Sequence, residues 1–148
     1  MRRLPFIVAL LILCNSPAAL AGFHFGVGPV DEIEGKRSGA AALSWETEHK
    51  HPWEFMGGVI RQRQDPAIRT PRVYFASISK RFTLNRWFAQ GGITATSSDT
   101  DVLSAHWQFQ TGIGYRYERF TLSLRHLSNA NTGGRNRGEN ILLLQYGF

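Results

Sequence analysis

The sequence predicts an all-β protein, an eight-stranded antiparallel transmembrane β-barrel. No segment shows sustained 3.6-residue periodicity, whereas segments of about ten residues alternate between apolar and polar positions along the chain. The apolar positions hold bulky and often aromatic residues, as expected for side chains that face lipid and its interface with water. Eight such strands can close a small barrel, which leaves no unpaired strand edge in the membrane. The alternative that the same pattern allows is a small secreted soluble barrel or sandwich.

The eight predicted strands are separated by turn residues. The first, 22–29, is short and rich in glycine, and a loop over 30–37 separates it from 38–48. A tight turn over 49–51 leads to 52–62, and a loop over 63–69 leads to 70–80. A turn over 81–85 precedes 86–96, and a loop over 97–101 precedes 102–115. A turn over 116–119 precedes 120–128, and a loop over 129–138 precedes the last strand, 139–148.

The predicted strand 102–115 shows the alternation most clearly. Its apolar face, which runs on into the next turn, contains Leu103, Ala105, Trp107, Phe109, Ile113, Tyr115 and Tyr117. In a membrane barrel this face contacts lipid, and the polar face fills the interior. We therefore expect His106 to point into the barrel with Ser104 and Gln108 and to take part in hydrogen bonds there.

The chain length leaves room for one domain, preceded by a signal peptide. Residues 1–21 begin with two arginines, continue with a short apolar run and end in an Ala-Leu-Ala cleavage site, which predicts a secretory signal. The barrel then occupies 22–148. Removal of the signal leaves no cysteine, because Cys14 is the only one, so a disulfide framework and cysteine-based metal or redox sites are excluded.

The predicted mature chain has fifteen basic and eleven acidic residues, which gives a net charge of +4. A basic secreted protein could meet nucleic acid, anionic lipid or the phosphates of lipopolysaccharide. For a membrane barrel we expect lipid and no nucleic acid. Six arginines fall in or near the loops predicted to be external, where they are either solvated or pair with phosphate: Arg61, Arg63, Arg69, Arg72, Arg135 and Arg137.

The end of the chain carries the candidate chemistry. An even number of antiparallel strands puts both chain ends on the periplasmic side, so the loop 129–138 is external and His126 and Ser128 lie at the outer end of the seventh strand. Being two residues apart, they share one face of the sheet, and our phasing directs that face to lipid. A histidine placed there can take the proton of a serine and so activate it as a nucleophile. The ordinary alternative is a polar cap where the strand leaves the membrane.

A third group usually fixes the orientation of such an imidazole, and the last strand begins with Glu139 and Asn140. Counting back from Phe148 makes Asn140 outward, on the side of His126, and Glu139 inward. The amide is thus better placed, unless a bulge at the start of the strand brings Glu139 round.

These residues resemble the PagL family of lipid A 3-O-deacylases. The resemblance rests on His126-Leu127-Ser128-Asn129-Ala130, on Asn136-Arg137-Gly138, and on a final strand whose apolar residues alternate up to Phe148. It implies an eight-stranded barrel of the bacterial outer membrane that hydrolyses the ester at the 3-position of lipid A, with no metal and no cofactor. It also implies that Ser128 is the nucleophile, that His126 is the general base and that Asn129 lies near the oxyanion site.

The chain departs from the family pattern at the third catalytic group. The pattern has a glutamate two residues after the glycine that matches Gly138, where this chain has Asn140, and its glutamate falls one place earlier, at Glu139. Either loop geometry absorbs the slip, or Asn140 orients His126, or the chain is a weakened relative. An amide holds the ring but does not stabilise the imidazolium by charge, so reduced activity is expected.

A second function stays open, a non-enzymatic outer-membrane barrel for adhesion or envelope integrity. It predicts that His126 and Ser128 are dispensable, and the short external loops speak against it. A palmitoyl transferase barrel would also use a serine and a histidine, but it would need an amphipathic helix for which the sequence leaves no room after residue 21. The sequence leaves open whether two copies form a homodimer.

Overall fold

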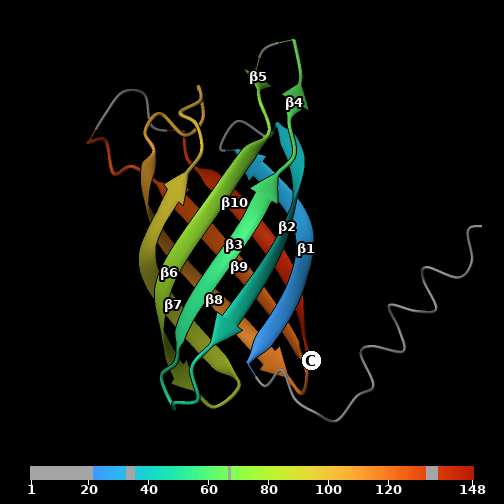
Figure 1. Cartoon of the computed structure of the whole chain (residues 1–148), viewed down its shortest axis with the longest axis vertical. Helices are drawn as coiled ribbons and strands as arrows, with labels where there is room; N and C mark the ends of the chain where they lie inside the picture. Colours follow the sequence, from blue (N-terminus) through green and yellow to red (C-terminus); the bar gives the residue numbers. More distant parts are fainter. Residues whose placement is uncertain (1–21, 33–35, 67, 133–136) are drawn as a thin grey trace, which may run out of the picture.

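The computed structural model describes residues 22–32, 36–66, 68–132 and 137–148. The predicted signal peptide, 1–21, lies outside the described residues, as do Arg135 and Asn136 in the last loop. Eight strands form a closed antiparallel barrel, which confirms the predicted fold class (Figure 1). They are β1 (Phe23–Glu32), β2 (Arg37–Glu46), β3 (Trp53–Ile60), β6 (Val73–Leu84), β7 (Trp87–Thr96), β8 (Trp107–Tyr117), β9 (Phe120–Ser128) and β10 (Glu139–Gly147). In the described residues no helix is long and apolar enough to cross a membrane.

Each strand of the barrel pairs with its neighbours in the chain, and β1 closes the ring by pairing with β10. The first residue of β1 and the last residue of β10 lie at the same end of the barrel, together with the turns 47–52, 85–86 and 118–119. We call this the turn end. The opposite end, which we call the loop end, carries Lys36, 61–66, 68–72, 97–106, 129–132 and 137–138 among the described residues (Figure 1). A small hairpin, β4 (Arg63–Gln64) with β5 (Arg69–Thr70), stands above the loop end where the sequence predicted only a loop.

The outer wall is apolar because side chains alternate across each strand. Large hydrophobic side chains are exposed on every barrel strand, and in a water-soluble protein such a surface would be unusual. Aromatic residues gather on this wall near the turn end, as the interfacial girdle of a membrane barrel requires. This girdle includes Trp45, Trp53, Trp87, Tyr117 and Phe120.

The interior holds two layers. Nearer the turn end, buried Glu46 and Glu54 pair with buried Arg81 and Arg125, and Gln145 joins the network. Towards the loop end, the interior contains an apolar cluster of Val30, Ile60, Val73, Leu103, Leu127, Ile141 and Leu143. The predicted turn at 81–85 is wrong in part. Arg81 belongs to β6, and the chain turns only after Leu84, through Asn85, whose φ is 55°.

The predicted sixth strand starts too early in the sequence. β8 begins at Trp107, so residues 102–106 belong to the preceding loop. Leu103, expected on the lipid face, is instead almost completely buried in the apolar layer that closes the loop end. His106, expected in the interior, is exposed in the loop, and its Nδ1 lies 2.9 Å from the carbonyl oxygen of Thr96. The apolar–polar alternation of the sequence extends into this loop because Leu103 is apolar. Its side chain fills the mouth of the barrel and does not face lipid.

Candidate active site

The candidate site lies on the outer wall at the loop end, where β9 and β10 are paired. His126 is directly opposite Asn140 and Leu127 is directly opposite Glu139 in an uninterrupted antiparallel register. His126, Ser128 and Asn140 are half-buried on the outer face, whereas Leu127 and Glu139 are buried on the inner face. The predicted faces of all these residues agree with the structure, because the register runs without a bulge from Tyr146 to Glu139.

His126 contacts the amide of Asn140. The distance between His126 Nδ1 and Asn140 Oδ1 is 2.9 Å. An amide oxygen only accepts, so Nδ1 carries the proton in this contact and Nε2 keeps its lone pair. Imidazole Nε2 is then the atom that can accept a proton from a hydroxyl.

Glu139 lies on the other face of the sheet. Its two carboxylate oxygens accept hydrogen bonds of 2.6 and 2.7 Å from the guanidinium of Arg63, inside the barrel. Both side chains of this bidentate ion pair, Arg63 and Glu139, are buried. The structure therefore brings Asn140, and not Glu139, to His126. It also corrects the expectation for Arg63, which is a buried partner of Glu139 and not an exposed arginine of the external loop.

The residues after Ser128 form a tight turn. The backbone N–H of Ala130 donates to Ser128 Oγ at 3.1 Å, and Ala130 and Asn131 both have left-handed φ angles, 52° and 60°. Asn129 is buried, its Nδ2 donates to Ser104 Oγ at 3.0 Å, and its Oδ1 accepts from the Asn131 N–H at 2.9 Å. A left-handed alanine is unusual, and such strain is found preferentially at functional sites. Asn129 therefore fixes the turn that follows Ser128.

Gly138 packs against the ring of His126. Its φ is +70°, and a Cβ atom added there would lie 2.7 Å from His126 Cε1 and 3.2 Å from His126 Nε2. Only a glycine allows both the left-handed backbone and this close approach. Gly138 on one side and Asn140 on the other thus set the position of the imidazole.

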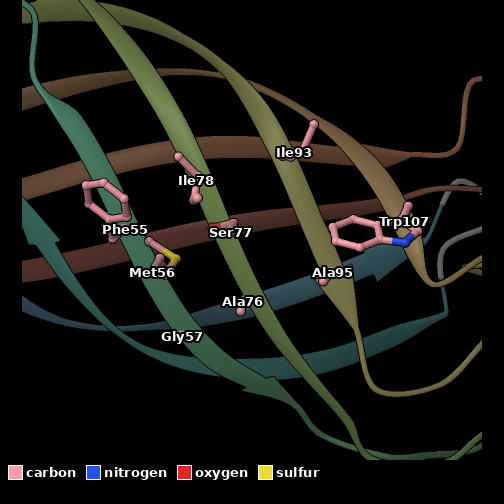
Figure 2. A pocket seen from close by; sticks show the side chains of 9 residues that line it. All are labelled: Phe55, Met56, Gly57, Ala76, Ser77, Ile78, Ile93, Ala95 and Trp107. Atoms are coloured by element: carbon pink, nitrogen blue, oxygen red, sulfur yellow. The ribbon is translucent and has the colours of Figure 1, made fainter.

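An apolar hollow of about 490 Å³ opens on the outer wall across β3, β6, β7 and β8 (Figure 2). Small residues, Gly57, Ala76 and Ala95, leave the space, and Phe55 and Trp107 stand at its edges. Trp107 is two residues from Phe109 on β8, and Phe109 is the cross-strand partner of Ser128. The hollow therefore begins on the strand next to Ser128 and leads away from it around the barrel.

Comparison with known proteins supports an outer-membrane enzyme fold. The family model described as "Lipid A 3-O-deacylase (PagL)" matches residues 31–148. The chain belongs to the PagL family. Among solved structures, the crystal structure of the outer membrane enzyme PagL matches with a TM-score of 0.55 and 13% sequence identity, over 84% of this chain and 99% of that one. No curated protein sequence matches the chain significantly.

Membership in the family of lipid A 3-O-deacylases makes the β9–β10 site the place to test. Two of its neighbours were not predicted as site residues. Gly138 belongs to the family motif but was not predicted to contact His126, although a glycine next to the last strand is a usual sign of a special backbone position. The partner of Glu139, Arg63, stands 76 residues away in sequence, and no local pattern could have identified it. No group of three metal-ligating side chains occurs among the residues that the structure describes.

Gly138→Ala should reduce turnover about a hundredfold while the barrel still folds. The new methyl group would displace the imidazole, and for the predicted role of His126 as general base a shift of about 1 Å has an effect of that size. Deacylation rates of the refolded variant would measure this, with Gly91→Ala as the control, because a Cβ at Gly91 meets nothing within 4 Å. Equal rates for the two variants would show that Gly138 does not position His126.

Proposed function

We propose that this PagL-family chain removes the 3-O-acyl chain of lipid A as a serine esterase. Ser128 is the nucleophile, His126 the general base and Asn140 the group that orients His126. The observation that carries the assignment is the 2.9 Å contact between His126 Nδ1 and Asn140 Oδ1, which leaves Nε2 as the proton acceptor on the face that Ser128 shares. Glu139 serves a structural role with Arg63.

The reaction proceeds in two steps. Ser128 Oγ attacks the ester carbonyl as its proton passes to His126 Nε2, and the tetrahedral intermediate collapses to an acyl-serine. The leaving 3-oxygen of the sugar takes the proton from His126. Water, deprotonated by the same imidazole, then attacks the acyl-serine, and the fatty acid and the free Ser128 hydroxyl are formed. The turn after Ser128, held by Asn129, lies where N–H groups can stabilise the oxyanion.

The barrel lies in the bacterial outer membrane with the loop end outside, and the exposed apolar wall and the aromatic girdle support this part of the proposal. Residues 1–21 act as the signal peptide that directs export. His126 and Ser128 then lie at the level of the outer head groups and face lipid. This suits the reaction, because the ester of lipid A lies in the same membrane. The basic residues near the loop end that are exposed, Arg61, Arg69 and Arg72, suit a phosphorylated lipid.

The apolar hollow suits an acyl chain of the substrate, so filling it should slow the reaction. Ala76→Phe places a ring in the hollow, and we expect kcat/KM to fall by about tenfold for long-chain substrates. Ala89→Phe is the matched control, since Ala89 is also exposed on the outer wall but does not line the hollow. A decrease of the same size in both variants would indicate a general effect on the barrel, and not occupation of the hollow.

Asn140→Asp should raise kcat by about tenfold. The new carboxylate oxygen would take the place of Asn140 Oδ1, 2.9 Å from Nδ1, and would stabilise the imidazolium by charge as well as by hydrogen bonding. Asn140→Leu, which removes the acceptor, should lower kcat strongly. Steady-state rates in detergent micelles would compare the three proteins. If both variants had the rate of the native chain, Asn140 would not be the residue that orients His126 in the reaction.

Mass spectrometry of lipid A from bacteria that express the chain would test the function itself. We expect the loss of one hydroxyacyl chain relative to cells with an empty vector. Unchanged lipid A, with the barrel shown to be folded in the outer membrane, would contradict the proposal and favour the non-enzymatic barrel.

A further inference from the structure

A carboxylate stands next to the candidate site on the outer wall. In the ladder between β1 and β10, Asp31 is the direct partner of Asn140, and Asn140 is the direct partner of His126 in the ladder between β10 and β9. Directly paired residues of antiparallel strands project to the same side of the sheet. Three neighbouring strands thus place Asp31, Asn140 and His126 in one row at the loop end.

Asp31 faces outward, and no ion pair joins it to another residue in the part of the chain that the structure describes. Phe25 and Val27 are exposed on the outer face of β1. Asp31 lies an even number of residues further along the strand, so its side chain is on the same outer face. Its Oδ1 is buried and makes no hydrogen bond with any described residue. The cross-strand neighbour on its other side is Arg37 of β2, but no ion pair joins the two in the described part of the chain. A carboxylate without a partner among the described residues is costly at the edge of a membrane, and such residues generally have a function.

We propose that Asp31 is a positioning residue that supplies, through Asn140, the negative charge that the amide at the third position lacks. This deepens the proposed function and rests on it. Asn140 Oδ1 faces His126, so the amide NH₂ group is the part of Asn140 available to interact with Asp31 on the opposite strand. A carboxylate polarises an amide that lies between it and an imidazole.

The charge of Asp31 acts when His126 becomes protonated. Adjacent strands lie about 5 Å apart, so Asp31 and His126 are about 10 Å apart, a distance at which two charges at a protein surface still interact. An anion at that distance stabilises the imidazolium of the transition state more than the neutral ring of the resting enzyme. It therefore raises kcat and leaves substrate binding unchanged.

Asp31→Asn should lower kcat by about tenfold with KM unchanged. Asp99→Asn, which removes the same charge from an exposed position in the loop 97–106, should have no effect. A change confined to KM, or equal effects of the two substitutions, would overturn the inference.

A charge effect of Asp31 can be separated from a structural one by testing Asp31→Asn both in the native chain and in the Asn140→Asp variant. In the Asn140→Asp background the direct carboxylate makes Asp31 redundant, and the two like charges repel each other. Asp31→Asn should then leave kcat unchanged or raise it. If Asp31 merely stabilised the barrel, the substitution would lower activity in both backgrounds, and the inference would fail.

Labelling of Ser128 by a fluorophosphonate probe keeps this test independent of the lipid substrate. The labelling rate of the folded barrel should fall about tenfold with Asp31→Asn and stay unchanged with Asp99→Asn. Labelling without lipid A cleavage would contradict the proposed function, and the Asp31 effect would still be measured. Native cleavage and labelling with no Asp31 effect would overturn the inference alone. A native chain that is not labelled would overturn the inference as well.

Discussion

Ser128→Ala should abolish lipid A deacylation, with a decrease in kcat of at least about a thousandfold, and leave the barrel folded. The substitution removes the only atom that forms the acyl-enzyme in the proposed mechanism. It also removes the acceptor of the Ala130 N–H, but that bond joins the last residue of β9 to the turn after it, at the loop end, and belongs to no strand ladder. We therefore expect the variant to migrate on electrophoresis without heating as the native barrel does.

The matched control is Ser98→Ala, in another loop at the same end of the barrel. Lipid A from cells that express either variant would be compared by mass spectrometry with lipid A from cells that express the native chain. Ser98→Ala should behave as the native chain does. Substantial cleavage by Ser128→Ala would eliminate the nucleophile assignment, even if the chain proved to be a deacylase.

The sequence allowed the geometry of the β9–β10 site to be predicted because strand phase is a counting argument. Alternate apolar residues from Phe148 back to Leu142 fix which side of β10 faces lipid, and the same count makes Asn140 outward and Glu139 inward. A one-residue difference decides whether a glutamate or an asparagine meets His126. The count holds only because no bulge interrupts the ladder, and sequence alone could not exclude one.

The loop end was less predictable, because its side chains turn inward where alternation suggested otherwise. Leu103 closes the barrel mouth as part of a loop, so its apolar character was taken for a strand residue facing lipid. Arg63 and Glu139 neutralise each other inside the barrel, although both come from segments that reach the external loops. Long-range pairing of this kind depends on closure of the ring and leaves no local signature.

The end of the first strand illustrates the same limit. The predicted strand stopped at residue 29, because glycines and a proline weaken it, whereas β1 continues to Glu32. That extension alone brings Asp31 into register with Asn140. Asp31 was consequently assigned to a loop, and its place beside the candidate site followed only from the pairing of the first strand with the last.

Glu54→Gln should destabilise the barrel by about 3–5 kcal/mol, the largest stability effect that we expect from one substitution. Glu54 is completely buried, and its carboxylate accepts hydrogen bonds from Arg81 at 2.6 Å and from Arg125 at 2.7 and 3.0 Å. Without the carboxylate, two guanidinium groups would stay buried with too little negative charge, because Glu46 forms ion pairs with Arg81 and Arg116, whereas Arg125 forms its ion pair with Glu54. Burial of an uncompensated charge is more costly than loss of a hydrogen bond.

Urea unfolding of the refolded barrel in lipid vesicles would measure the loss, with Glu48→Gln as the control, since Glu48 is exposed in the turn 47–52. Adding Arg125→Met to Glu54→Gln should restore part of the stability, because it removes the cation that the first substitution leaves unpaired. If Glu54→Gln unfolded at the same urea concentration as Glu48→Gln, the interior charges would contribute little to the fold. The polar interior would then add little to the stability of the barrel, which would come from the hydrogen bonds between strands and from the contact of the outer wall with lipid.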